Sequence, residues 1–441
     1  MSSKVTVVGA GLAGSECALQ LARRGIHVRL IEQRPCHPSP AHHTDGFAEL
    51  VCSNSLKSTK PDSAAGLLKR ELDGMGSYLL GFARQCAVPA GGALAVDRER
   101  FSAMVTTSVC SNPLIDVERQ EALEIPEDPC VIAAGPLCSE ALFSAVESAV
   151  GEGHMSFFDA AAPIVSAESI DRTIAFSQSR YEEGVGDYLN CPMNREEYEA
   201  FIDALLGASR VIGRDFEQKD LFCACQPVEE VARTGRDAIR FGALKPVGLT
   251  DPRTGHRPWA AVQLRAETAD ALAYNLVGFQ TNLTWPEQRR VFRMIPGLED
   301  AEFLRYGVMH RNSFVDSPHV LDKTFKIPGT QARLAGQICG TEGYVEAIAS
   351  GLLAALNTYA DLSGFEPVEL PKTSSFGALV SYATDPATKD YQPMHVNFGI
   401  VPPLETHVRD KVRRRAELAA RAERDFDAYL ASRPELFAVS E

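Results

Sequence analysis

A glycine-rich turn near the start of the sequence constrains the fold more than any other stretch. An apolar run at residues 5–8 leads into the pattern GAGLAG, which begins at Gly9. An amphipathic segment follows over residues 15–24, and a second apolar run at 28–31 ends at Glu32. This order predicts strand, turn, helix and strand, the opening unit of a Rossmann-type α/β domain.

The spacing of the glycines predicts a dinucleotide site. Gly9 permits a tight turn, Gly11 lets the backbone approach a pyrophosphate, and Gly14 lets the helix pack on the strand. The helix N-terminus offers N–H groups to phosphates, and Glu32 can accept hydrogen bonds from a ribose. The alternative is a tight turn without a ligand. FAD is favoured over NAD because the motif lies at the N-terminus of a long, interrupted chain. The residues expected to hold the cofactor here are Gly9, Ala10, Gly11, Leu12, Ala13, Gly14 and Glu32.

The composition bounds the class of protein. At 441 residues the chain is long for one domain, so two or three domains are expected. No apolar run is long enough to span a bilayer, and no signal-peptide pattern opens the sequence, so we expect a cytoplasmic protein without a membrane partner. The 11 cysteines show no repeating spacing, which argues against a disulfide framework.

The charge gives no support for a nucleic-acid partner. The formal net charge is −14, whereas dedicated nucleic-acid binders usually carry a basic field. Basic clusters do occur, but such a cluster is more often a solvated surface than a binding site. They would indicate a binding site only if they gathered on one surface. They lie at residues 233–240, 253–258, 287–293 and 409–415.

The order of segments predicts an FAD-binding domain interrupted by an insertion. We expect the FAD-binding domain to comprise residues 1–195 and 303–441, and a smaller inserted α/β domain to comprise 196–302. Residues 63–86 have helical spacing, and Asn194 is a candidate N-cap of the helix that follows it. The segment 333–358 predicts a strand, a glycine turn and a long apolar helix, a common closing element of FAD domains.

Two cysteines are candidates for chemistry. Cys52 lies in AELVCSNS, and Cys225 lies in FCACQPVE, two residues after Cys223. A thiol is a strong nucleophile, although each cysteine taken alone is more readily structural. No metal site is expected, because no second cysteine pair or nearby histidine completes a ligand set. The pair His42 and His43 offers ligands or bases, but such a loop pair is usually polar surface.

Several motifs together resemble the TrmFO (Gid) family of folate- and flavin-dependent tRNA (uracil-5-)-methyltransferases. They run in order from about residue 4 to residue 404 and include GAGLAGSE, PAHHTDGFAELVCSNSLKS, VPAGGALAVDRERFS, KPVGLTDPRTGHRP, YNLVGFQTNL, RVFRMIPGLEDAEFLRYGVMHRNSF and GTEGYVEAIASG. The resemblance implies a GidA-like flavoprotein fold with FAD as cofactor.

The resemblance also implies a reaction and its residues. Family members methylate carbon 5 of a uridine in the tRNA T-loop, with methylenetetrahydrofolate as carbon donor and reduced flavin, regenerated by NADH or NADPH, as reductant. By motif match the nucleophile that adds to carbon 6 of uracil is Cys225, and Cys52 is the acid/base or protective partner. The residues that would lie beside the isoalloxazine are Gly336, Gly343, Tyr344 and Val345, with Tyr344 stacking on the ring.

The sequence departs from the family at one of these places. The family usually reads FEGCMPIE where this chain reads FCACQPVE, so the thiol of Cys225 is kept but its neighbours change. These changed residues bear on the identity of the substrate more than on the flavin site. The alternatives are a family paralogue with another acceptor, such as ribosomal RNA, and a flavin oxidoreductase without RNA methylation. A noncatalytic RNA-binding module is a third reading, against which the complete FAD signature argues.

Overall fold

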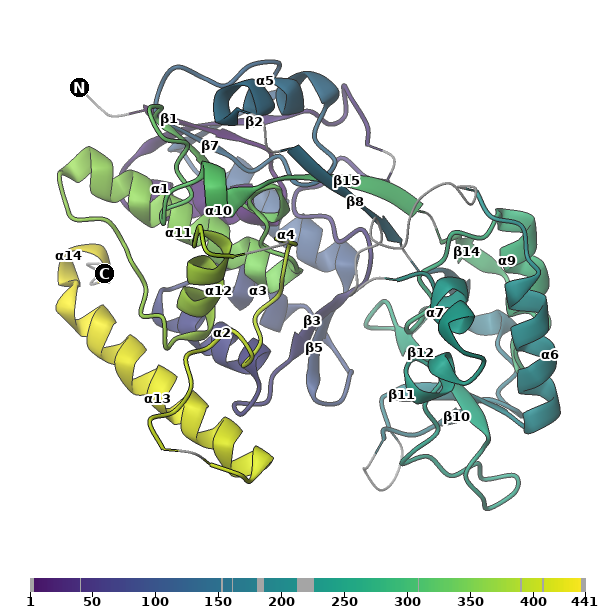
Figure 1. Ribbon diagram of the computed structural model, residues 1–441. Coiled ribbons are helices and arrows are strands. Elements are labelled where there is room, and N and C mark those ends of the chain that lie inside the picture. The colour runs from purple at the N-terminus through teal and green to yellow at the C-terminus, as the bar shows by residue number, and fades with distance from the viewer. Residues whose placement is uncertain are drawn as a thin grey trace.

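The computed structural model describes residues 4–39, 41–151, 154–160, 162–180, 186–211, 226–307, 309–388, 391–406 and 408–437. Two units of unequal size make up this part of the chain (Figure 1). The larger unit contains both ends of the sequence, and the smaller unit is formed by the middle of the sequence. Each unit has its own hydrophobic core.

A parallel sheet forms the centre of the larger unit. Its strands, in spatial order, are β16 (Ala332–Leu334), β7 (Cys130–Ile132), β1 (Lys4–Val8), β2 (His27–Glu32) and β6 (Ile115–Arg119). The expected order of strand, glycine turn, helix and strand is confirmed, with α1 (Leu12–Arg23) between β1 and β2. Because parallel strands end on the same side, the ends of β1, β2, β7 and β16 form one edge where a ligand can bind.

Helices enclose this sheet. The longest apolar one, α11 (Tyr344–Ser363), packs directly against α1. The others are α2 (Ala64–Gly74), α3 (Tyr78–Gln85), α4 (Arg98–Cys110), α5 (Glu140–Val150), α10 (Ser317–Val320), α12 (Ser375–Ala383), α13 (Lys411–Ser432) and α14 (Pro434–Phe437). A small antiparallel sheet lies beside them, formed by β3 (Ser55–Ser58), β5 (Ala93–Val96) and β4 (Ala87–Val88). Within the described residues, no helix is both long and apolar enough to cross a membrane.

The helical stretch expected over residues 63–86 is two helices, α2 and α3. Gly76 separates them with a φ of +74°, a conformation that a helix interior does not allow. Ser77 then caps α3 through a hydrogen bond from Leu80 N, and buried Glu16 of α1 accepts from Leu79 N at 2.8 Å. The apolar spacing continues across the break because both helices bury side chains in the same hydrophobic core.

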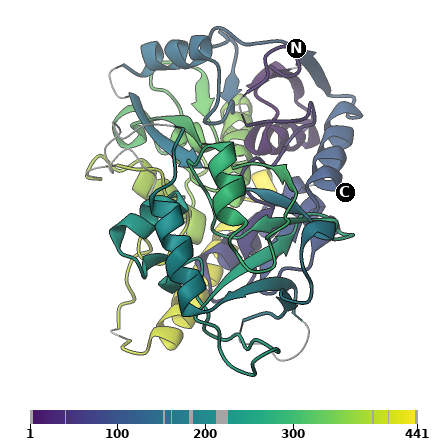
Figure 2. The same cartoon turned by 90° about the vertical axis from the view of Figure 1, so that its right-hand side faces the viewer.

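The smaller unit is an antiparallel sheet covered by helices. Its strands, in spatial order, are β10 (Phe176–Ser177), β11 (Tyr188–Met193), β12 (Ala260–Ala266), β13 (Ala273–Leu276), β9 (Ile164–Ser166) and β14 (Phe303–Arg305). Its helices are α6 (Arg195–Leu206), α7 (Val228–Thr234), α8 (Ala238–Phe241) and α9 (Trp285–Phe292). Asn194 caps α6 in a reciprocal capping box with Glu197, as the sequence predicts. Figure 2 shows this unit in front of the larger one.

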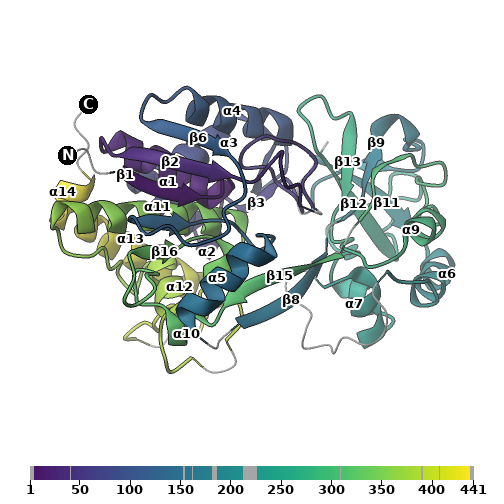
Figure 3. The same cartoon turned by 90° about the horizontal axis from the view of Figure 1, so that it is seen from above.

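Two long strands join the units. β8 (His154–Ala160) and β15 (Met309–Val315) pair antiparallel and lead from the larger unit to the smaller one (Figures 1 and 3). Strands β9, β10 and β11 precede residue 196, and yet they belong to the sheet of the smaller unit. The expected insertion, 196–302, therefore begins inside that sheet. We propose that the inserted unit runs from about residue 162 to 307, the part of the chain that forms the second core.

Candidate active site

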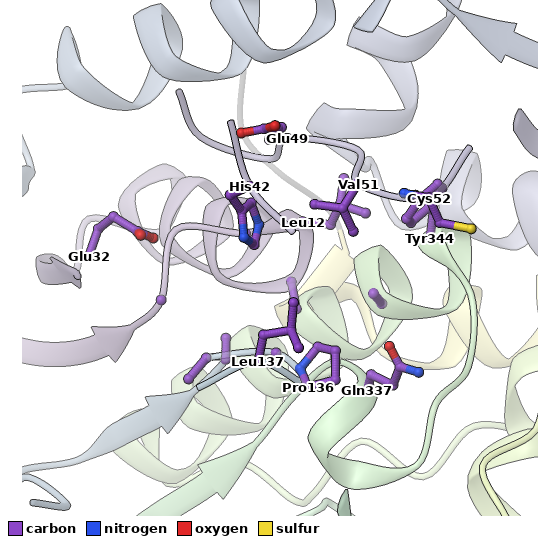
Figure 4. A pocket seen from close by; sticks show the side chains of 18 of the residues that line it. Leu12, Glu32, His42, Glu49, Val51, Cys52, Pro136, Leu137, Gln337 and Tyr344 are labelled. Carbon is purple, nitrogen blue, oxygen red and sulfur yellow. The ribbon is translucent and has the colours of Figure 1, made fainter. Parts of the chain in front are cut away.

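A cavity of about 360 Å³ opens at the edge of the parallel sheet. It lies at the N-termini of α1 and α11, and the loop of residues 41–55 forms its opposite wall (Figure 4). The predicted site residues that line it are Gly9, Gly11, Leu12, Ala13, Glu32, Cys52, Gly336, Gly343 and Tyr344. Ala10, Gly14 and Val345 are buried behind this surface. Segments from the start, middle and end of the larger unit thus converge on one cavity.

The glycine turn is shaped to receive a phosphate group. Gly9 has a φ of +97°, and a Cβ there would lie 2.5 Å from the carbonyl oxygen of Ala133. A Cβ at Gly14 would lie 1.8 Å from the carbonyl oxygen of Gly9, so only glycine lets α1 approach the turn this closely. A Cβ at Gly11 would meet no atom within 4 Å, because Gly11 faces the cavity. The turn therefore fits a pyrophosphate held on backbone N–H groups at the start of α1.

Glu32 lies at the end of β2 and is only 4% exposed. Its Oε2 accepts a hydrogen bond from Ala10 N at 2.8 Å, and its Oε1 accepts from Arg34 Nε at 2.9 Å. A carboxylate has about four acceptor positions, so Oε2 retains capacity for a ribose hydroxyl. Buried Arg34, which sequence reasoning missed, also pairs with Glu49 at 3.3 Å. This ion-pair chain fixes the cofactor end of the loop.

Tyr344 joins the Cys52 loop to α11. Its hydroxyl accepts hydrogen bonds from the backbone N–H groups of Cys52, at 2.8 Å, and Ser53, at 3.1 Å. Burial raises the pKa of the Tyr344 hydroxyl above its usual range, with the neighbouring Cys52 contributing, so this group stays protonated at neutral pH. Figure 4 shows Cys52 and Tyr344 at one end of the cavity. The thiol is therefore positioned by a residue nearly three hundred positions further along the chain.

Three arginines hold the same loop by its carbonyl and side-chain oxygens. Arg98 donates to Leu50 O at 2.7 Å, Arg305 of β14 donates to Val51 O at 2.7 Å, and Arg265 of β12 donates to Ser53 Oγ at 2.8 Å. Arg98 also pairs with Glu267 of the inserted unit at 2.5 Å. Two of the three arginines come from the inserted unit, so that unit helps to fix the loop. Sequence reasoning missed all three, because they are scattered among many exposed arginines.

A lysine lies at the α11 end of the cavity. Lys57 adopts a φ of +63°, and its Nζ pairs with Oε1 of fully buried Glu346 at 3.2 Å. A Cβ at Gly343 would lie 2.8 Å from this Nζ, so glycine leaves room for the ammonium group. Burial, followed by the charge of Lys57, lowers the pKa of His395 nearby. The cavity therefore has a lysine ammonium group beside the N-terminus of α11.

The two adjacent histidines have different positions. His42 lines the cavity and shares a hydrogen bond of 2.5 Å with Ser39, whereas His43 is exposed. Burial lowers the pKa of His42 to about 4, and the charge of Arg34 adds to this effect. His42 is therefore neutral at neutral pH. Among the described residues no cluster of histidine, cysteine or acidic side chains is suited to a metal ion.

Cys225 and Cys223 lie outside the described residues. The chain on either side of them is described. Val211 N donates to Asn282 O at 2.8 Å, and Val228 N donates to Gln280 O at 2.7 Å. Gln280 itself lines the cavity. Of these two anchors, only Val228 is therefore bonded directly to a cavity residue.

Many arginines of the basic clusters are neutralised locally. Arg236 pairs with Glu199 and Asp203, both at 2.6 Å, and Arg253 pairs with Asp251 at 2.8 Å. Arg290, Arg233 and Arg413 are paired with acidic residues of their own helices. These pairs fit the expectation that most of the clusters are ordinary solvated faces.

Comparison with known proteins places this arrangement in context. Residues 4–366 match the family model described as glucose inhibited division protein A. The chain is 52% identical over 435 residues to the methylenetetrahydrofolate–tRNA-(uracil-5-)-methyltransferase TrmFO of Geobacter sulfurreducens, covering 98% of this chain and 100% of that protein. It is 48% identical over 423 residues to the TrmFO of Bacillus licheniformis, covering 96% and 98%.

A solved structure shares the fold. GidA of Aquifex aeolicus, in one crystal form, superposes with a TM-score of 0.71 at 16% identity, covering 100% of this chain and 78% of that chain. A second crystal form gives a TM-score of 0.68 at 15% identity, covering 97% and 74%. At this identity the likeness concerns the fold alone.

Proposed function

The chain belongs to the TrmFO branch of the glucose inhibited division protein A family, and from this premise we propose that it is a methylenetetrahydrofolate–tRNA-(uracil-5-)-methyltransferase. The observation that carries the proposal is the cavity, which joins a dinucleotide turn to the loop of Cys52. Its substrates would be a uridine of tRNA and methylenetetrahydrofolate. A cytoplasmic location, where tRNA is modified, belongs to the same proposal.

FAD fits the residues present. The turn from Gly9 to Gly14 would hold the pyrophosphate, and Glu32 would accept from a ribose. Gly336, Gly343, Tyr344 and Val345 would surround the isoalloxazine, which when bound supplies the reducing equivalents for methyl formation. NADH or NADPH would restore its reduced form. The open surface at Gly11 and the position of Gly343 in the cavity lining support this assignment.

The protein's own chemistry would rest on two thiols. We assign the attack on carbon 6 of uracil to Cys225, and the removal of the carbon 5 proton, or protection of the nucleophile, to Cys52. The hydrogen bonds from Cys52 N and Ser53 N to Tyr344 support a fixed position for the Cys52 side chain. The hydrogen bond of Val228 to cavity residue Gln280 supports the assignment of Cys225, three residues earlier in the sequence, to this site.

Transfer of labelled carbon to RNA tests the proposal. Unmodified tRNA transcript, ribosomal RNA, labelled methylenetetrahydrofolate and NADH or NADPH are incubated with the flavin-loaded protein. Label is expected as 5-methyluridine in tRNA. NAD(P)H oxidation without label in either RNA would instead establish the flavin oxidoreductase that the altered FCACQPVE segment leaves as the second candidate, and label confined to ribosomal RNA would change the acceptor.

Cysteine variants test the assignment of roles. Cys225→Ala and Cys52→Ala are expected to abolish methylation and to retain FAD, whereas Cys138→Ala, a half-buried cysteine outside the cavity lining, is the matched control. If Cys225→Ala kept full activity and Cys223→Ala lost it, the nucleophile would lie two residues earlier.

A further inference from the structure

Three aromatic rings form a parallel stack on the inserted unit. Phe303 and Tyr306 have ring centroids 5.2 Å apart and planes 12° apart, and Tyr306 and Trp285 follow at 5.4 Å and 15°. Tyr306 is thus the middle ring, and Trp285 is one end of the stack. We call Phe303, Tyr306 and Trp285 the aromatic stack.

The outer end of the aromatic stack is exposed to solvent. Trp285 is 58% exposed although one face of its indole lies against Tyr306, and neighbouring Leu304 is 56% exposed. An exposed tryptophan leaves a large apolar area in contact with water, and a partner that covers it gains binding energy. Tryptophans are therefore concentrated in binding sites. The free face continues a series of parallel rings, so it is shaped to receive one more flat ring.

Buried hydrogen bonds hold the aromatic stack in place. Gln288 of α9 is fully buried, and its amide nitrogen donates to Leu283 O at 2.8 Å and to Gly307 O at 2.9 Å. Its amide oxygen accepts from Gly307 N at 2.8 Å. These bonds fix the first turns of α9 against the chain that carries Tyr306. Binding of a ring to Trp285 would therefore lose little conformational entropy, because the surface is already ordered.

An unneutralised cation lies beside the rings. Exposed Arg289 donates from Nη2 to the Tyr306 hydroxyl at 2.7 Å and makes no ion pair with any described residue. Its neighbour Arg290, in contrast, is paired with Glu287. Aromatic rings for stacking bases, combined with cations for the backbone, are the usual elements of surfaces that bind single-stranded nucleic acid.

The segment that carries two rings of the aromatic stack also contacts the loop of Cys52. Arg305 lies between Leu304 and Tyr306, and its guanidinium donates to Val51 O and Ala41 O in the loop of Cys52. β14 is the last strand of the inserted unit and precedes β15, which leads back to the larger unit (Figure 1). The chain that carries the aromatic stack therefore contacts the wall of the cavity directly.

We propose that Trp285 is a stacking platform for an unpaired or helix-end nucleobase of the RNA substrate, with Arg289 binding an adjacent phosphate. The proposal rests on the methyltransferase function proposed above, and it adds a surface that positions the RNA outside the cavity. Stacking reads no base edge, so this contact contributes affinity with little sequence preference.

Variants of the exposed ring test the proposal with unmodified tRNA transcript. Trp285→Ala is expected to raise both the Kd and the KM for tRNA about tenfold or more, the loss of one base–aromatic stack, with kcat, FAD content and melting temperature unchanged. Trp285→Phe keeps a stacking face and is expected to bind more tightly than Trp285→Ala. Leu304→Ala, equally exposed but outside the stack, is the control with unchanged affinity.

Fluorescence gives a readout independent of catalysis. The chain has two tryptophans, so in a Trp259→Phe background the emission comes from Trp285 alone. Quenching on addition of tRNA transcript is expected, and Arg289→Gln should weaken it. Unquenched emission together with an unchanged Kd in Trp285→Ala would overturn the proposal. A difference in sedimentation between Trp285→Ala and the wild-type protein, both without RNA, would also overturn it, because it would identify a second protein chain as the partner that covers Trp285. RNA-dependent quenching without label transfer would refute the methyltransferase function and leave the platform supported.

Discussion

At the scale of single residues, the hydroxyl of Tyr344 is the group that ties the Cys52 loop to α11. Tyr344→Phe removes the acceptor of two backbone N–H groups, and each donor left unsatisfied costs about 1 kcal/mol or more. We expect a lower melting temperature and a greater loss in methylation rate than in FAD affinity, because the ring is kept. Tyr359→Phe, on the same helix, is the control. Equal behaviour of the two variants would show that the hydroxyl does not position the loop.

A second residue-scale prediction concerns pH. The pKa of His42 is lowered from 6.5 to about 4 in the folded protein, so the unfolded chain binds more protons between these values. The contribution of neutral His42 to stability is complete above pH 6.5 and is lost as the pH falls towards 4.

The measurement is the free energy of unfolding between pH 7 and pH 5. His42→Gln, which cannot be protonated, is expected to show a smaller decrease over this range than the wild-type protein. His256→Gln, in an exposed loop of the inserted unit, is the control. An unchanged decrease in His42→Gln would mean that other groups cause the pH dependence.

At the scale of elements, the contact between α1 and α11 decides the shape of the cavity, because both helices begin at its wall. A Cβ at Gly351 of α11 would lie 2.0 Å from the carbonyl oxygen of Ala13. Gly351→Ala should therefore separate the helices, destabilise the fold by about 1–3 kcal/mol and reduce FAD content.

The matched substitution is Gly81→Ala in α3, where a Cβ would meet no atom within 4 Å. Removing a glycine from a helix interior should leave stability unchanged or raise it by up to about 1 kcal/mol. Denaturant unfolding and flavin absorbance of both variants give the comparison. A stable, flavin-loaded Gly351→Ala protein would show that the helices can relax apart without cost.

At the scale of the whole molecule, the inserted unit helps to hold the active-site loop. Arg305→Gln removes charge-assisted hydrogen bonds to that loop, each worth about 1.5–3 kcal/mol. We expect faster hydrogen exchange in residues 46–55 and a lower kcat, with FAD retained. Arg236→Gln removes an exposed arginine that pairs only within the inserted unit. If both variants exchanged alike, the two units would act independently.

The sequence by itself determined the features that depend on local sterics and local hydrogen bonds. The turn from Gly9 to Gly14 can be predicted because a positive φ at Gly9 and the close approach of the backbone at Gly14 exclude other residues. The helix cap at Asn194 can be predicted because its partner, Glu197, is only three residues away in the sequence. The family resemblance added the identity of the chemistry, which no local rule supplies.

Tertiary structure alone decided which distant groups meet. Strands β9, β10 and β11 belong to the sheet of the smaller unit because antiparallel strands pair without regard to their separation in the chain. Tyr344 and Arg305 reach the Cys52 loop from nearly 300 and just over 250 residues away. Such contacts follow no spacing rule, since long side chains can donate or accept hydrogen bonds from any nearby element. The glycine turn can therefore be predicted from the sequence, whereas the contacts that hold the loop of Cys52 form only once the chain has folded.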